Sequence, residues 1–362
     1  MVDYNLFGKS GLNVSKYALG TIPFSGTKGF EKLADMNQET ANYMVDYALD
    51  QGINQFDTAN LYAKGDSEIV LGKAIKDKRQ DMIISSKTGF QITDNPNALG
   101  ATRSNIEASI DASLKRLGTD YIDLYYIHFW DGQVPVYETV QVMNDLINKG
   151  KIRYWGVSNY SGWALAKTHT LAVENNMMPP IAHQLYYTPE AREAEYELLP
   201  AGRELGIANS IWSPLGAGIL TGKITRNKKA EPGTRQGNGW HEPYIKDMNL
   251  FYDLVDVLQD VASKHDATVA QVVLAWLRDR PNVDSIVLAA RNKEQLHENI
   301  ASYNLKLTDD DIRQITDLTA LEPIYPLWHR AINSNSYNRA SDAEKVYFEE
   351  YSKMMKSKKR DL

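Results

Sequence analysis

The chain has 362 residues, 43% of them hydrophobic, and it contains no cysteine, which excludes disulfides, thiolate metal sites and cysteine nucleophiles. Its formal net charge of −6 argues against a strongly basic surface of the kind that binds nucleic acid or an anionic membrane, so we expect a small-molecule partner. There is no signal-peptide pattern and no run of about 18 apolar residues, so we expect a cytoplasmic protein that does not enter the membrane.

Short β-prone runs alternate with amphipathic helical segments, which predicts βα units around a parallel sheet. Ahead of them, residues 3–15 place a glycine-containing turn between two apolar stretches, which predicts a β-hairpin outside the repeat. Strands are expected at residues 17–20, 54–58, 82–87, 124–128, 154–157, 181–185, 207–212 and 285–289. Helices are expected at residues 39–50, from about 66, at 102–117, 136–149, from 161, at 192–205 and around 296–300.

Eight strands with helical connections favour a closed (β/α)8 TIM barrel over an open doubly wound sheet. We therefore expect one domain over residues 1–362, with the barrel at about 16–305 and a C-terminal helical extension at about 306–362. The long segment 216–247, after the seventh strand, is rich in glycine, asparagine and charge, and loops of this length are usually functional lids or poorly ordered.

Four polar side chains stand at or just after the ends of adjacent predicted strands: Asp57, Tyr62, Lys87 and His128. The active site of a parallel barrel lies at the carboxyl ends of its strands, so these groups can converge. A lysine cation lowers the pKa of a nearby phenol, Asp57 can hold that lysine in place, and His128 can polarise a carbonyl oxygen. Such a set can exchange a proton with an oxygen whose carbon gains or loses hydride, and the hydride requires a nicotinamide.

Five segments resemble the signature segments of the aldo-keto reductase superfamily, in the same order and spacing. They are residues 56–62 (FDTANLY), 86–88 (SKT), 126–128 (YIH), 155–159 (WGVSN) and 212–215 (WSPL). The resemblance covers residues 4–319. It implies a carbonyl reductase or alcohol dehydrogenase in which Tyr62 is the general acid or base and Asp57, Lys87 and His128 complete a tetrad.

The same resemblance implies a set of cofactor-binding residues. They are Gly20, Thr21, Ile22, Asp57, Ser158, Asn159, Gln184, Trp212, Ser213, Pro214, Leu215, Gly218, Lys223, Arg291, Gln295 and Asn299. Among these, Trp212 would stack on the nicotinamide and Lys223 would hold the pyrophosphate. The chain departs from the family at Ala289, where glycine is common, and Arg291 and Lys293 offer cations for a 2′-phosphate. This favours NADP(H), with NAD(H) also possible.

The aromatic residues Phe24, Phe129, Trp130 and Trp328 are expected to line a pocket for a carbonyl or alcohol substrate. Alternative interpretations remain for several residues. Asp57 with Lys87 can be a purely structural ion pair, Trp212 can be a packing residue, and residues 158–159 can cap the following helix. A cofactor-binding regulatory subunit that acts through a protein partner is the alternative function. A metal-dependent barrel hydrolase is less favoured, because seven histidines supply few ligands and we expect no metal.

Overall fold

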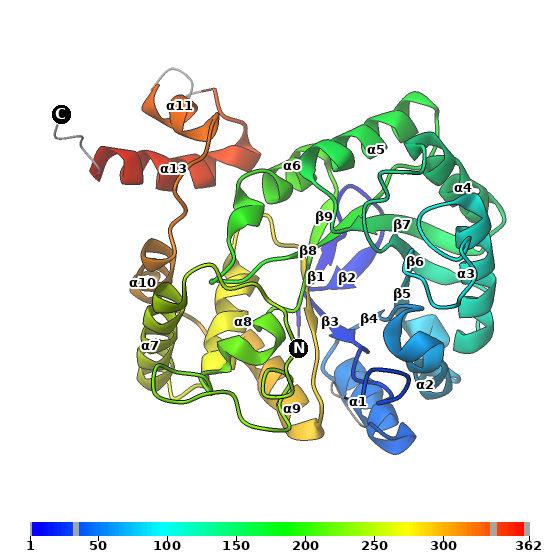
Figure 1. Ribbon diagram of the computed structural model, residues 1–362, viewed down its shortest axis with the longest axis horizontal. Helices are drawn as coiled ribbons and strands as arrows, with labels where there is room; N and C mark the ends of the chain where they lie inside the picture. Colours follow the sequence, from blue (N-terminus) through cyan, green and yellow to red (C-terminus); the bar gives the residue numbers. More distant parts are fainter. Residues whose placement is uncertain (1, 32–35, 334–338, 358–362) are drawn as a thin grey trace.

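The computed structural model describes residues 2–31, 36–333 and 339–357, and it contains the predicted barrel. Eight parallel strands close into a barrel at the centre of a ring of helices (Figure 1). In this barrel, β10 pairs with β3 on one side and with β9 on the other. The barrel strands are β3 (Tyr17–Gly20), β4 (Gln55–Asp57), β5 (Ile83–Thr88), β6 (Ile122–Ile127), β7 (Ile152–Ser158), β8 (Ala182–Tyr186), β9 (Ala208–Trp212) and β10 (Ser285–Leu288). The (β/α)8 prediction is confirmed.

A β-hairpin closes one end of this barrel. Strands β1 (Tyr4–Leu6) and β2 (Asn13–Ser15) pair antiparallel, as predicted. Phe7, in the turn between them, is fully buried against Leu124, Tyr126 and Ala182 of the barrel strands. The Lys9 N–H donates to the backbone oxygen of Gly206 at 2.7 Å, just before β9 begins at Ala208. The hairpin therefore blocks the amino-terminal end of the barrel, and the carboxyl end is left for a site.

Helices surround the strands. They are α1 (Gln38–Asp50), α2 (Asp66–Ile75), α3 (Arg103–Leu117), α4 (Val136–Asn148), α5 (Gly162–Glu174), α6 (Leu198–Leu205), α7 (Met248–Lys264), α8 (Val269–Asp279), α9 (Lys293–Ala301), α10 (Asp309–Leu318), α11 (Leu327–Ile332) and α13 (Asp342–Ser357). Short 3-10 helices occupy Tyr62–Gly65, Arg79–Asp81, Glu193–Glu195, Gly216–Thr221 and Ser302–Asn304. The predicted caps of α3 are present, because Thr102 accepts from the Asn105 amide and Gly118 adopts a φ of 65°.

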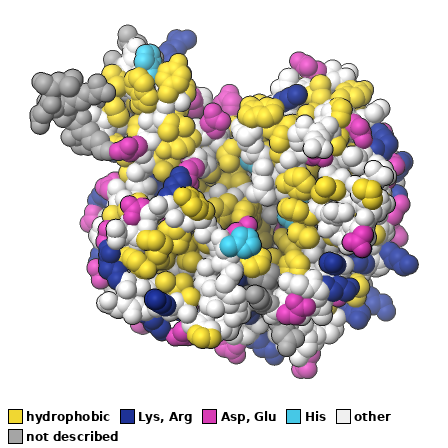
Figure 2. All heavy atoms as spheres, in the orientation of Figure 1, with side chains coloured by type: hydrophobic (Ala, Val, Ile, Leu, Met, Phe, Trp, Pro, Cys, Tyr) yellow, Lys and Arg dark blue, Asp and Glu magenta, His cyan; other side chains and the backbone are white. Residues whose placement is uncertain are grey.

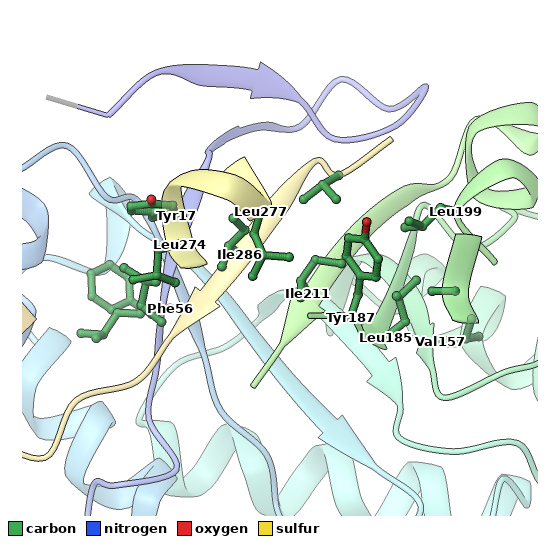
Figure 3. Close-up of a cluster of buried hydrophobic side chains, with 14 of the residues drawn as sticks. Tyr17, Phe56, Val157, Leu185, Tyr187, Leu199, Ile211, Leu274, Leu277 and Ile286 are labelled. Atoms are coloured by element: carbon green, nitrogen blue, oxygen red, sulfur yellow. The ribbon is translucent and has the colours of Figure 1, made fainter. Parts of the chain in front are cut away.

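The main hydrophobic core lies between the barrel and these helices. In the part drawn in Figure 3, Ile286 of β10 lies beside Leu274 and Leu277 of α8. Helix α8 is buried on nearly all sides, because α7 packs over it. The sequence 269–277 is therefore almost continuously apolar, and Gln271 is the one polar residue within it. Neither α7 nor α8 was predicted, although the buried residues of α7 recur at helical spacing and Thr268 forms a capping box with Gln271 at the start of α8.

One predicted helix is shorter than expected. The prediction of a continuous helix over residues 192–205 is wrong: a 3-10 turn spans Glu193–Glu195, and α6 begins only at Leu198. Pro200 gives the physical reason. It has no backbone N–H, so it is tolerated only within the first turn of a helix.

The C-terminal extension is attached to the outside of the barrel. Helix α10 packs on α7, while α11 and α13 pack on each other and α13 reaches α6 (Figure 1). A buried cluster of charges anchors α13: Glu350 joins Arg192 at 2.5 Å and Arg280 at 3.4 Å, and both arginines pair with Glu195. In the described part of the chain, no helix has the length and apolar character needed to cross a membrane.

Candidate active site

Strand alternation brings the predicted catalytic residues to one place. Side chains two residues apart on a strand face the same side, so Ser85 and Lys87 of β5 both face the barrel axis. Asp57 is the last residue of the neighbouring strand β4, and Gln184 of β8 reaches it across the barrel. His128 follows directly after β6.

Asp57 and Lys87 form a fully buried ion pair. The Lys87 side chain is 0% exposed and that of Asp57 is 2% exposed. The second carboxylate oxygen of Asp57 accepts hydrogen bonds from Ser85 Oγ at 2.7 Å and from Gln184 Nε2 at 3.0 Å. Lys87 Nζ also donates to the backbone oxygen of Thr58 at 2.9 Å. The ammonium group is therefore fixed in position by the carboxyl end of β4, which Asp57 closes and Thr58 follows.

The same ammonium group reaches the phenol of Tyr62, with Lys87 Nζ 3.4 Å from Tyr62 Oη. Tyr62 begins a 3-10 turn in which Ala63 and Lys64 have positive φ values of 48° and 49°, a costly conformation that clusters at functional sites. Burial raises the pKa of Tyr62, and the Lys87 cation opposes that rise. The sequence led us to expect a lowered pKa from the cation, but the effect of burial is larger, and the phenol is held in its protonated form.

His128 completes the group. Its ring meets that of Tyr62 edge to face with centroids 6.1 Å apart, and Phe90 packs against its other side at 4.9 Å. Burial and the Lys87 cation lower the pKa of His128 well below its ordinary value. Its Nδ1 atom is buried without a hydrogen-bond partner. The imidazole is therefore neutral near pH 7.

A cavity of about 540 Å³ opens at this point. Asp57 and Tyr62 line it, together with the predicted cofactor residues Gly20, Ile22, Gln184, Trp212 and Ser213. On the face of the molecule drawn in Figure 2, hydrophobic side chains gather around a central hollow.

A second cavity of about 350 Å³ adjoins the first, and they share Ser213, Ala217, Arg235 and Ala289. It is lined by eight of the predicted cofactor residues: Ser213, Pro214, Leu215, Gly218, Lys223, Arg291, Gln295 and Asn299. Burial lowers the pKa of Arg235, and Arg291 lowers it further because the two like charges lie close together. That arrangement favours an anion between them. The donor set fits a phosphorylated dinucleotide with its phosphates in this cavity.

Other predicted cofactor residues support the site without lining either cavity. Thr21 and Ser158 are buried. Asn159 donates to the backbone oxygen of His128 at 3.0 Å and accepts from Trp212 Nε1 at 3.1 Å. The alternative in which residues 158–159 cap the next helix is wrong, because Ser161 is the residue that caps α5.

Lys293 is placed differently from Arg291, the other cation considered for a 2′-phosphate. Its Nζ atom lies over the ring of Tyr43, 4.1 Å from the centroid. It is absent from the residues that line the second cavity, whereas Arg291 is among them.

The four residues predicted for the substrate pocket lie elsewhere. Phe24 is completely buried in the main core. Phe129 packs on Phe90, Trp130 packs on two other aromatic rings, and Trp328 belongs to α11 in the extension. None of the four lines either cavity.

The walls of the first cavity come instead from two loops. They contribute Tyr186, Glu190, Ala191 and Glu193 after β8, and Arg235, Trp240, Glu242, Pro243, Tyr244 and Lys246 after β9. The second group falls within segment 216–247, for which length and composition indicated a functional lid or a poorly ordered loop. Its individual residues carried no signal, because irregular backbone has no period to reveal which side chains face inward.

A metal site is not formed by the described residues: within 2–31, 36–333 and 339–357, no three His, Asp or Glu side chains gather in a way that could hold an ion.

Comparison with known proteins agrees with the geometry of the barrel. The chain is 34% identical over 334 residues to a putative voltage-gated potassium channel subunit beta of Schizosaccharomyces pombe, covering 89% of this chain and 95% of that protein. It is 32% identical to the aldo-keto reductase YhdN (90% and 97% covered) and 32% identical to the uncharacterized oxidoreductase YrpG (88% and 96% covered), both of Bacillus subtilis. The model of the aldo/keto reductase family matches residues 18–320. The chain therefore belongs to the aldo/keto reductase family, whose members are nicotinamide-dependent oxidoreductases.

Proposed function

We propose that this protein is an NADP(H)-dependent oxidoreductase that interconverts an aldehyde or ketone and the corresponding alcohol, with Tyr62 as the general acid or base. The observation that carries the proposal is the position of Lys87 Nζ, which pairs with Asp57 and lies 3.4 Å from Tyr62 Oη at the wall of the larger cavity.

Each member of the tetrad has a role that follows from its surroundings. In carbonyl reduction, Tyr62 donates its proton to the carbonyl oxygen, and the Lys87 ammonium group stabilises the phenolate that is left. Asp57 keeps Lys87 charged and in place, because burial by itself lowers the pKa of Lys87 and the carboxylate raises it, with a net rise. Neutral His128 can donate a hydrogen bond to the same oxygen. In the oxidation direction, Tyr62 accepts the proton.

The cofactor roles follow from the two adjoining cavities. When bound, the nicotinamide supplies the hydride, which no side chain can carry. Trp212 and Gln184 would contact the nicotinamide end, while Lys223, Arg235 and Arg291 would hold the phosphates. The preference for NADP(H) rests on Arg291.

The decisive experiment is Tyr62→Phe. It removes the acidic hydroxyl and keeps the ring, so turnover of NADPH with a panel of aldehydes and ketones is expected to fall about 10²- to 10⁴-fold. NADPH binding, followed by nucleotide fluorescence, should change less than about threefold. Tyr137→Phe, at a tyrosine that is 45% exposed on α4, is the matched control and should retain full activity. Full activity in Tyr62→Phe would refute the assigned role.

Cofactor preference has its own test. Arg291→Ala is expected to raise KM for NADPH about tenfold and to leave KM for NADH nearly unchanged, because only NADPH carries the 2′-phosphate. An equal effect on both cofactors would place Arg291 away from that phosphate.

The names of several relatives favour a second candidate function. Relatives from a yeast and from two plants are named putative or probable voltage-gated potassium channel subunits beta. The corresponding proposal is a cofactor-binding regulatory subunit that acts through a protein partner. Recovery of a stoichiometric partner with the tagged protein, together with negligible turnover over the carbonyl panel, would favour this candidate over the reductase.

A further inference from the structure

Two polar atoms on residues of the larger cavity have no hydrogen-bond partner in the protein. They are Glu190 Oε2 and Trp240 Nε1, each buried, and each on a side chain that lines the cavity. A buried polar atom left without a partner costs about 1–3 kcal/mol, so native structures normally satisfy such atoms. A molecule bound in the cavity can supply partners for both.

The charged residues near Glu190 do not form an ion pair with it. Glu193 repels it, and the nearby Lys246 is paired with Glu193. Burial, followed by the repulsion from Glu193, raises the pKa of Glu190 to about 7. Glu190 is therefore a carboxyl group at the cavity wall that still lacks a donor, and an anionic substrate group would be repelled by it above neutral pH.

The chemistry of the unsatisfied atoms identifies the group they fit. An ionised carboxylate only accepts hydrogen bonds, and an indole N–H only donates one. A hydroxyl group does both, so the hydroxyl groups of a molecule in the cavity can donate to Glu190 and accept from Trp240. An ammonium group would satisfy Glu190 and leave the indole N–H without a partner.

We infer that Glu190 and Trp240 recognise a hydroxyl group of the substrate, so that the preferred substrate is a carbonyl compound bearing a hydroxyl group away from its carbonyl carbon. The inference rests on the proposed oxidoreductase function and assigns specificity to two residues outside the tetrad. Trp212, Tyr186 and Tyr244 supply the aromatic part of the wall, along which the carbon skeleton would lie.

The test compares 4-(hydroxymethyl)benzaldehyde with 4-methylbenzaldehyde, which differ only in the hydroxyl group. At pH 8, kcat/KM with NADPH is expected to favour the hydroxylated aldehyde about 10- to 100-fold. Glu190→Leu and Trp240→Phe should each reduce this ratio to below about threefold. Glu190→Gln keeps an acceptor and should retain a larger share of the ratio than Glu190→Leu. Glu197→Gln, at an exposed position before α6, is the control and should keep the full ratio.

A third aldehyde separates recognition of a hydroxyl group from simple attraction of a cation. If 4-(trimethylammoniomethyl)benzaldehyde is preferred over the hydroxymethyl compound, the inference is overturned. Equal kcat/KM for the hydroxymethyl and methyl compounds, or an unchanged ratio in Glu190→Leu, overturns it as well.

A binding measurement keeps this inference distinct from the catalytic proposal. Calorimetric titration of Tyr62→Phe with the two aldehydes, with and without NADPH, should show the hydroxymethyl compound binding about tenfold more tightly. The same difference in affinity is expected even if the wild-type protein turns over neither aldehyde. Absence of turnover would count against the proposed reductase function and not against the recognition of a hydroxyl group. Equal affinities would overturn the recognition of a hydroxyl group.

Discussion

Replacing Lys87 by methionine tests the buried ion pair on which the site depends. The substitution keeps the length of the side chain and removes its charge. It leaves the Asp57 carboxylate, 2% exposed, with neutral hydrogen bonds from Ser85 and Gln184 as its remaining partners. Breaking a buried ion pair in this way costs about 3–5 kcal/mol.

The double variant Asp57→Asn/Lys87→Met removes both charges and retains an oxygen that can accept the two neutral hydrogen bonds. It should therefore be more stable than Lys87→Met, and the coupling free energy between the two sites should be at least about 2 kcal/mol. The control is Lys78→Met, whose partner Asp46 is 50% exposed, and it should cost less than about 1 kcal/mol.

The assay is urea denaturation followed by tryptophan fluorescence at pH 7.5, with the transition midpoint and slope recorded for every variant. The reasoning is refuted if Lys87→Met costs no more than Lys78→Met, or if the double variant is destabilised by the sum of its two single changes. Either result would mean that the low exposure of the pair does not isolate its charges from water.

Three further predictions concern the fold around the site. Gly156→Ala would place a Cβ atom 2.7 Å from the backbone oxygen of Ala182, so the free energy of unfolding should fall by about 1–3 kcal/mol. The urea midpoint measures this loss, and an unchanged midpoint would contradict the close approach. Glu350→Ala removes the carboxylate that reaches Arg192 from α13, so the free energy of unfolding should fall by about 1–2 kcal/mol. Limited trypsin digestion should then release the C-terminal fragment sooner than in the wild-type protein. Equal digestion rates would show that the contact does not anchor the helix. The pKa of His128 is lowered in the folded protein, so below about pH 6.5 the unfolded chain binds a proton that the folded chain does not, and stability should fall as the pH falls from 7 to 5. His128→Gln should weaken this dependence, as measured by urea midpoints across that range, and an unchanged slope would mean that the imidazole is not held neutral by the fold.

Much of the fold and the tetrad could be predicted from the sequence, because both depend on local patterns. Eight β-prone runs alternated with helical segments, and Asp57, Lys87 and His128 each stood at the end of one run. Parallel strands bring their carboxyl ends to the same edge, so position along the chain was enough to predict that these groups meet. Their spacing also carried the family resemblance, which the comparisons confirm.

The tertiary structure alone decided which side chains line the cavities. Phe24 was predicted to line the substrate pocket and lies in the main core instead. Glu190, Arg235 and Trp240 carried no sequence signal and line the first cavity. The physical reason is common to these cases: the burial and direction of side chains in loops depend on contacts with residues far along the chain, and no local pattern encodes them.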